Sequence, residues 1–134
     1  MNKAVMFSSL RGDWKTPKEL MGELEKEFHF DRDITPPKHS VDELDPNPWT
    51  GVVYGNPPYG RGIGDWTAKG LKSCGGGAIV VMLLPARTDT KWFHRDILGQ
   101  AEIRFIKGRL HFDGHKNGAP FQSMIVIWRA TTKK

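Results

Sequence analysis

The sequence predicts an α/β fold, with a mostly parallel sheet, flanking helices and antiparallel strands at its C-terminal edge. Three observations support this prediction. Helix and strand patterns alternate through the middle of the chain, residues 16–106. Residues 78–84 form a continuous apolar run, which is typical of a central strand buried on both faces. Strand patterns then cluster towards the C-terminus.

The first predicted helix begins next to Thr16 and Pro17 and runs to about Glu27. Thr16 suits the N-cap, Pro17 the first helical position, and Glu19 stands three residues after Thr16, which makes a capping box. One apolar helical face follows, formed by Leu20, Met21, Leu24 and Phe28. Residues 1–11 show no clear period, so we expect a loose arm there.

Two more helices are predicted. Asp65 is a candidate N-cap for one of them, and the glycines after Cys74 end it. The other covers residues 90–98, with Trp92, Phe93 and Ile97 facing inward.

The remaining patterns predict strands. Besides 78–84, the predicted strands are 28–34, 49–54, 101–106, 110–112 and 123–128.

Composition bounds the class of protein. The chain has 134 residues, enough for one domain and hard to divide into two. The composition, with 38% hydrophobic and 26% charged residues, argues against a wholly disordered chain. The lone Cys74 excludes an intramolecular disulfide and a cysteine zinc cluster. No apolar run approaches a membrane span of about 20 residues and residues 1–9 do not resemble a signal peptide, so we expect a cytoplasmic protein.

Positive charge is concentrated in the second half of the chain. Residues 1–60 carry 7 Lys/Arg and 10 Asp/Glu, whereas residues 61–134 carry 13 and 5. A basic half fits a polyanion partner, most simply nucleic acid, although a merely basic solvated surface explains it as well. Three basic residues there are candidate phosphate contacts: Arg87, Lys107 and Arg109.

Asn56-Pro57-Pro58-Tyr59 is the most informative stretch of the sequence. It follows a strand pattern, and two consecutive prolines force the chain out of the sheet in an extended shape. The turn presents an amide, carbonyls without neighbouring N–H groups and an aromatic ring. These groups suit a planar amino-bearing ligand such as adenine; the alternative is a proline-rich surface turn, with Tyr59 in the core. Ligands of parallel α/β sheets bind outside the carboxyl ends of the strands, where this motif is expected.

The chain resembles the phage-type, Dam-like DNA N6-adenine methyltransferases. The resemblance runs in order over nearly the whole chain, through Trp14-x-Thr16-Pro17, Phe28-x-Phe30-x-x-Asp33, Trp49-x-Gly51, Asn56-Pro57-Pro58-Tyr59, residues 84–90, Trp92-Phe93-His94, Lys107-Gly108-Arg109 and Phe121-x-Ser123. It implies a small class I, Rossmann-like methyltransferase domain that takes its methyl group from S-adenosylmethionine. It also implies adenine in DNA as acceptor, and a phage or prophage gene expressed in a bacterial cell.

The resemblance also assigns residues. Asn56 to Tyr59 become the catalytic motif, with Asn56 also beside the donor. Thr16 and Pro17 help to hold the donor, and Asp33 is the acidic donor residue after the first strand. Trp14 and Phe30 are candidate contacts of the donor adenosine, with the core as the alternative. One departure is that the segment from Asp33 to Pro37 lacks the glycine-rich donor loop of larger methyltransferases.

These residues support a mechanism without prior deprotonation. If the Asn56 side-chain oxygen and the Pro57 carbonyl accept hydrogen bonds from the adenine amino group, its lone pair turns towards the methyl sulfonium. Pro58 shapes the turn, and Tyr59 is expected to stack on a base flipped out of the duplex. The alternatives are methylation of adenine in RNA or of a protein glutamine, and a non-catalytic nucleic-acid-binding module. We assign no metal, because Gly114 between His111 and His115 argues against a helical pair.

Overall fold

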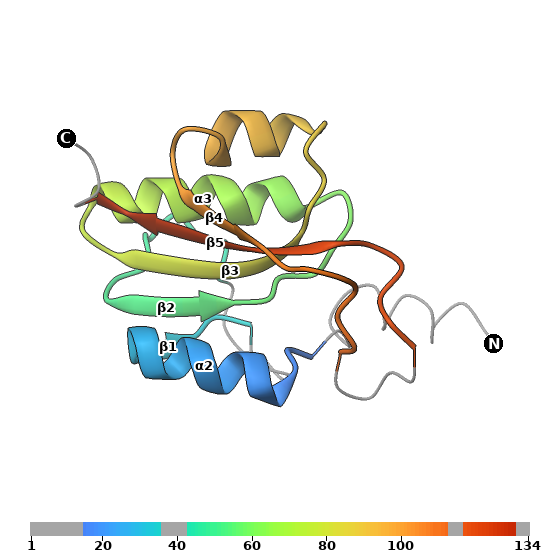
Figure 1. Ribbon diagram of the computed structural model, residues 1–134. Helices are drawn as coiled ribbons and strands as arrows, with labels where there is room; N and C mark the ends of the chain where they lie inside the picture. Colours follow the sequence, from blue (N-terminus) through green and yellow to red (C-terminus); the bar gives the residue numbers. More distant parts are fainter. Residues whose placement is uncertain (1–14, 36–42, 113–116, 131–134) are drawn as a thin grey trace.

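The computed structural model describes residues 15–35, 43–112 and 117–130, so the predicted arm at 1–11 and Trp14 lie outside the described residues. Its centre is one five-stranded sheet in the order β1-β2-β3-β5-β4 (Figure 1). The strands are β1 Arg32–Asp33, β2 Val52–Gly55, β3 Ile79–Pro85, β4 Glu102–Phe105 and β5 Ser123–Arg129.

The directions of the strands confirm the predicted fold class. β1, β2 and β3 pair in parallel, and β5 runs antiparallel to both of its neighbours, β3 and β4. The edge strand β4 therefore points the same way as β1 to β3. As a consequence, β1, β2, β3 and β4 all end at one side of the sheet, which we call the carboxyl edge.

Strand β3 lies at the centre, as its apolar run predicts. Its side chains from Val80 to Leu84 are all 0% exposed. They alternate between two apolar clusters, one on each face of the sheet. Helix α3 (Ile63–Gly75) and the π-helical turn η1 (Phe93–Ile97) cover one face, and α2 (Lys18–Phe28) lies on the other (Figure 1).

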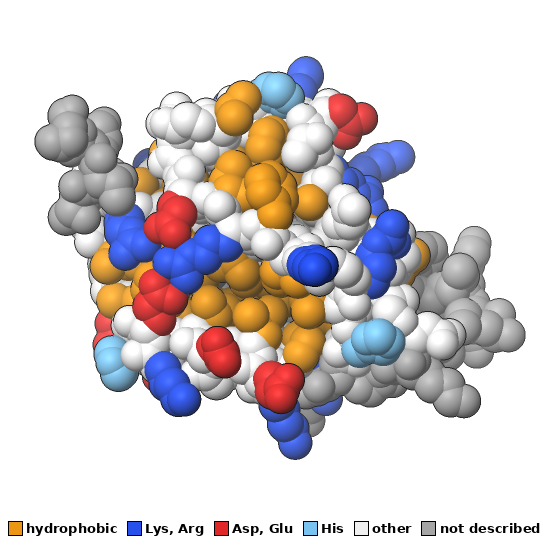
Figure 2. Space-filling view, in the orientation of Figure 1, with side chains coloured by type: hydrophobic (Ala, Val, Ile, Leu, Met, Phe, Trp, Pro, Cys, Tyr) orange, Lys and Arg blue, Asp and Glu red, His pale blue; other side chains and the backbone are white. Residues whose placement is uncertain are grey.

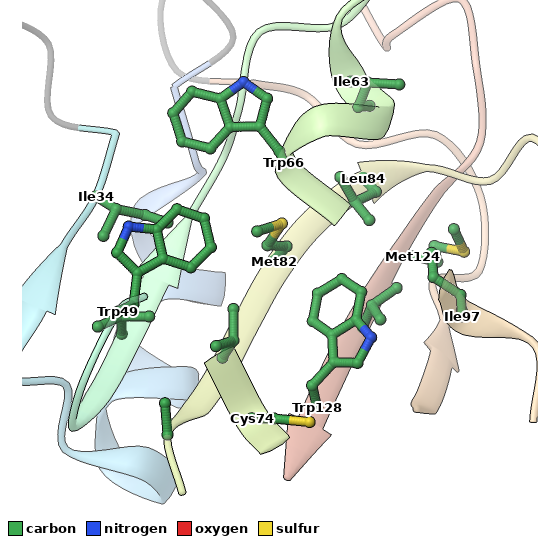
Figure 3. Packing of buried hydrophobic residues seen from close by; sticks show 14 of the residues in the cluster. Ile34, Trp49, Ile63, Trp66, Cys74, Met82, Leu84, Ile97, Met124 and Trp128 are labelled. Atoms are coloured by element: carbon green, nitrogen blue, oxygen red, sulfur yellow. The ribbon is translucent and has the colours of Figure 1, made fainter. Parts of the chain in front are cut away.

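The face under α3 is packed around aromatic rings. Trp49 stacks against Trp66 of α3 at a centroid distance of 6.1 Å, and Trp128 projects from β5 on the other side of Met82 (Figure 3). The indole N–H of Trp128 donates to the Asp96 carbonyl at 2.9 Å. This bond ties η1 to the sheet strand beneath it.

Helix α2 confirms the predicted helix, but its start differs from the prediction. Pro17 is the N-cap, with φ −57° and ψ 139°, and no side-chain hydrogen bond caps the helix. The capping box is therefore wrong, because the Thr16 hydroxyl turns to Tyr54 instead. At the other end, His29 adopts φ 56° and terminates the helix after Phe28. Of the strand predicted for residues 28–34, only β1, Arg32–Asp33, forms.

Two further predictions are modified. Helix α3 begins at Ile63 after Gly62, so Asp65 lies in its first turn rather than at the N-cap. Residues 110–112 form no strand, and that prediction is wrong. The Leu110 carbonyl accepts one backbone bond, from Ala119 at 2.8 Å, and Phe112 fills the α2-side cluster from a loop. Leu110 and Phe112 therefore pack into the core although their segment pairs with no strand.

Gly51 shows why the segment before β2 needs glycine. Its φ is +76°, and a Cβ there would lie 2.7 Å from the Asp31 carboxylate oxygen Oδ2. That oxygen accepts the Val52 N–H at 2.9 Å, while the Asp31 N–H donates to the Val52 carbonyl at 2.7 Å. These two bonds between Asp31 and Val52 extend the pairing of β1 and β2 by one residue towards the start of the strands.

Candidate active site

The Asn56 side chain is hydrogen-bonded at both ends of its amide, at the carboxyl edge. Asn56 directly follows β2 and is partly buried. Its amide N–H donates to Thr16 Oγ1 at 3.3 Å, and its side-chain oxygen accepts the Tyr59 hydroxyl at 3.0 Å. The two hydroxyl groups thus hold the amide at both of its ends.

Thr16 links this amide to the interior of the sheet. Its hydroxyl lies 2.6 Å from the Tyr54 hydroxyl. Tyr54 belongs to β2 and is 1% exposed, and burial raises the pKa of its phenol well above the ordinary value, with the Asp33 carboxylate adding to the rise. The phenol therefore stays protonated and remains a hydrogen-bond donor to its neighbours.

A second link holds the backbone of Asn56. The Asn56 N–H donates to Thr35 Oγ1 at 2.7 Å. Thr35 in turn directs both its hydroxyl, at 3.2 Å, and its backbone N–H, at 2.8 Å, to Asp33 Oδ1. The end of β1 and the end of β2 are thus joined through one threonine side chain.

Sequence reasoning missed Thr35. The available signal was its position two residues after Asp33, a spacing at which an aspartate side chain commonly accepts bonds from the following turn. This turn occupies the place where a glycine-rich loop was expected and not found.

Tyr59 contributes its hydroxyl rather than an open ring face. The side chain is 6% exposed and meets Phe121 edge to face at 5.2 Å. Its hydroxyl lies within hydrogen-bonding distance of the Asn56 side-chain oxygen and of the Leu83 carbonyl, at 3.0 and 3.2 Å. Burial raises the pKa of this phenol too, so it stays protonated. In this arrangement the ring has no free face for the base stacking expected from the sequence.

The two prolines have different environments. Pro57 is buried and Pro58 is partly exposed. Within 15–35, 43–112 and 117–130, no backbone N–H donates to the Pro57 carbonyl, and the next residue, Pro58, has no N–H to compete for it. Among the described residues, the motif therefore sets a carbonyl oxygen without a backbone donor next to the hydrogen-bonded amide of Asn56, at the carboxyl edge.

Comparison with protein families identifies the group to which the chain belongs. Residues 3–134 match the family model Dam, described as DNA N-6-adenine-methyltransferase. The chain is a member of the Dam family. Membership makes it an enzyme and implies N6-adenine methylation of DNA with S-adenosylmethionine as donor. Comparison with curated proteins and with solved structures found no match.

The structure shows the surroundings of two residues on the β1 side of Asn56 that the sequence offers as donor contacts, Asp33 and Phe30. Asp33 is the last residue of β1, exposed, with Oδ1 engaged by Thr35. In the described part of the chain no hydrogen bond to its Oδ2 occurs, so a carboxylate oxygen is available for a ribose hydroxyl. Phe30, by contrast, packs against Phe28 and Tyr54 at 5.8 and 5.3 Å, which favours the core alternative for this ring.

The candidate phosphate contacts all lie in loops at the carboxyl edge. Arg87 follows β3, whereas Lys107 and Arg109 follow β4, and all three are exposed. Arg109 also donates to the Ala119 carbonyl at 3.4 Å. On the face shown in Figure 2, Lys and Arg are interleaved with Asp and Glu at the left, whereas Lys and Arg predominate towards the right, the end to which β2 points.

The structure also shows the surroundings of His94 and Cys74. His94 contacts the Thr88 carbonyl at 2.8 Å, and Cys74 is buried in α3. Over the described ranges, no group of three metal-ligating side chains is placed to hold an ion. Nor does any helix there have the length and apolar character needed to cross a membrane.

Proposed function

We propose that this chain acts as one methyltransferase domain that methylates N6 of adenine in DNA, at the corner formed by Asn56 and Pro57. The observation that carries the proposal is the frame of hydrogen bonds around Asn56. Three polar side chains, Thr16, Thr35 and Tyr59, hold its amide and its backbone at the carboxyl edge. The Dam family match supplies the reaction class.

The corner suits the transition state of amino-group methylation. The lone pair of the adenine amino nitrogen is delocalised into the ring in the ground state. Acceptance of its two N–H bonds, one by Asn56 Oδ1 and one by the Pro57 carbonyl, favours a pyramidal nitrogen and stabilises the positive charge that develops on it. An amide oxygen has two lone pairs, so Asn56 Oδ1 can accept one hydrogen bond from the base and another from the Tyr59 hydroxyl.

The donor is assigned to the β1 side of this corner. S-adenosylmethionine supplies an electrophilic methyl group when bound. Asp33 is assigned to bind ribose hydroxyls through its exposed carboxylate, beside Thr16 and Pro17 at the start of α2. Since Thr16 already bonds both Tyr54 and Asn56, we assign it to position the amide as well as to border the donor.

The target adenine must leave the duplex to reach this corner. Extruding it costs a few kcal/mol. Because the Tyr59 ring is buried, the compensation is assigned to hydrogen bonds at Asn56 and Pro57 and to contacts of Arg87, Lys107 and Arg109 with the backbone. Pro58 fixes the extended turn that presents these groups.

Transfer of labelled methyl groups from S-adenosylmethionine to unmethylated DNA, RNA and protein tests the proposal. We expect label in DNA, at N6 of adenine. Asn56→Ala should lower kcat about 10²–10³-fold, the usual effect of one such electrostatic group, while DNA binding persists. Tyr59→Phe keeps the buried ring and removes only its hydroxyl, so it should lower kcat by a smaller factor. Label only in RNA or protein, or DNA binding without transfer by the wild type, would contradict the proposal.

A further inference from the structure

A second pocket opens beside the catalytic motif, on the side away from Asp33. Its volume is about 390 Å³, within the range of ligand sites. It lies between the loop after β2 and the segment after β3. Its lining includes Arg61, Ile63, Pro85, Arg87, Thr90 and Trp92.

The charge of this pocket is unbalanced. Two guanidinium groups line it, and no acidic side chain does. Among the ion pairs of the described residues, none involves Arg61 or Arg87. Two neighbouring cations without a counter-charge attract an anion, and a planar fork of donors matches a phosphate.

Another pocket of the molecule gives the contrast. It has a volume of about 320 Å³ and lies against the outer side of α3, with Asp45, Asp65, Lys69 and Lys72 among its lining residues. There Lys69 pairs with the Asp45 carboxylate at 3.2 Å and also donates to the Asp45 carbonyl at 3.0 Å. The charges of that pocket are matched, so of these two pockets the one with Arg61 and Arg87 favours an anion.

The wall of the arginine pocket is fixed before any ligand arrives. The Thr90 hydroxyl donates to the Arg87 carbonyl at 2.9 Å and accepts the Phe93 N–H at 3.2 Å, which joins the Arg87 loop to η1. Arg95 then joins η1 to the start of α3, by donating to the Gly64 carbonyl at 2.9 Å. A prearranged wall loses less conformational entropy on binding than a mobile one.

The place of the pocket in the sheet identifies the anion. Arg61 is on the same loop as Asn56, five residues later. Strand β2 lies between β1 and β3, so the donor groups and this pocket are on opposite sides of the motif. A donor bound at Asp33 would have to cross the motif loop to reach the pocket, whereas a DNA strand whose adenine entered the corner at Asn56 would place its neighbouring nucleotide on this side.

We propose that this pocket binds the nucleotide next to the target adenine. Arg61 and Arg87 contact its phosphodiester, and the apolar surface of Ile63, Pro85 and Trp92 accommodates its sugar and base. The pocket then holds the strand while the neighbouring adenine is turned out towards Asn56. This inference rests on the proposed function, because it takes DNA as the substrate.

The test compares two charge-matched double variants in DNA binding, with no methyl transfer needed. R61Q/R87Q removes the two pocket cations, and K26Q/K72Q removes two exposed cations in the last turns of α2 and α3, at the other end of the sheet (Figure 1). The affinity for adenine-containing duplex is measured over a series of salt concentrations. Each phosphate that is no longer neutralised reduces the slope of log affinity against log salt by about 0.9, so R61Q/R87Q, which loses the contact with one phosphodiester, should lose about 0.9 and the control pair almost nothing.

A second measurement locates the contact on the DNA. A neutral methylphosphonate placed beside the target adenine should weaken binding by the wild type but cause no further loss in R61Q/R87Q. The affinity for S-adenosylmethionine, measured by calorimetry, should be unchanged in both double variants; a loss confined to R61Q/R87Q would assign the pocket to the donor carboxylate and overturn the proposal.

The outcomes distinguish a failure of the pocket proposal from a failure of the proposed function. If the wild type methylates DNA and R61Q/R87Q keeps the wild-type salt slope, or the control pair loses as much, the pocket proposal is wrong and the proposed function stands. If the wild type neither binds nor methylates DNA, both are wrong.

Discussion

Replacing Thr35 with valine tests whether the two hydrogen bonds of this hydroxyl organise the site. Valine keeps the shape of the side chain and removes the oxygen that accepts the Asn56 N–H at 2.7 Å and donates to Asp33 at 3.2 Å. A polar group left without its partner in a partly buried place costs about 1–3 kcal/mol. The Asn56 loop avoids this cost only by moving, and a displacement of about 1 Å at a reacting centre can cost about a hundredfold in rate.

We therefore expect Thr35→Val to lower kcat about 10–100-fold, which corresponds to about 1.4–2.8 kcal/mol in the barrier. The KM for S-adenosylmethionine should rise as well, because Thr35 also fixes the Asp33 carboxylate. The assay is methyl transfer to DNA at saturating DNA and varied donor, at a temperature well below the unfolding midpoint of the variant.

Thr35→Ser is the matched control, because it restores the oxygen without the methyl group. It should keep kcat close to that of the wild type. The reasoning is refuted if Thr35→Val transfers methyl groups at the wild-type rate, or if serine and valine lose the same amount. Equal losses would mean that the packing of the methyl group, and not the hydroxyl, is what the position requires.

Two stability predictions follow from buried groups. Burial raises the pKa of Tyr54 and Tyr59 above the ordinary value of 10.0, so their ionisation should not affect the unfolding free energy below about pH 10. Above that pH, the unfolded chain releases phenolic protons that the folded chain keeps, and stability should fall by about 1.4 kcal/mol per pH unit for each tyrosine. Denaturant titrations between neutral pH and pH 11 measure this slope, and a flat profile would contradict it. At Gly70, an alanine Cβ would lie 3.0 Å from the buried Trp128 ring, so overpacking of about 1–3 kcal/mol should outweigh the helix-propensity gain of about 1 kcal/mol. Gly22→Ala, whose Cβ meets nothing within 4 Å, should instead raise the melting temperature.

Local patterns predicted those parts of the fold that depend on burial. The apolar run at 78–84 became β3 because only the centre of a sheet covers both faces of such a strand. Residues 110–112 alternate apolar and polar side chains as a strand does but have no strand partner, because pairing depends on a second segment that cannot be read from the local pattern. The direction of β4 was likewise inaccessible, because it follows from β5 inserting between β3 and β4.

In the candidate site, too, local features could be predicted from the sequence and long-range contacts could not. Asn56 and Pro57 could be proposed as site residues from the sequence because proline geometry and amide chemistry are local properties. The hydrogen-bond partners of Asn56 could not be predicted in this way, because Thr16 is 40 positions away and Thr35 is 21. Thr16 also matched a helix cap, and nothing in its neighbourhood indicated that a tyrosine hydroxyl would compete successfully for it. The burial of Tyr59 depends in the same way on Phe121, which is contributed from near the C-terminus.

The insertion of β5 between two earlier strands has a consequence for synthesis of the chain. While the ribosome is still making residues 123–129, β4 has no neighbour on the sheet, because its one partner strand does not yet exist. The loop that carries Lys107 and Arg109 is therefore anchored last. A nascent chain can pair β1 with β2 before it can anchor this loop, so the contribution of Lys107 and Arg109 to polyanion binding should form late.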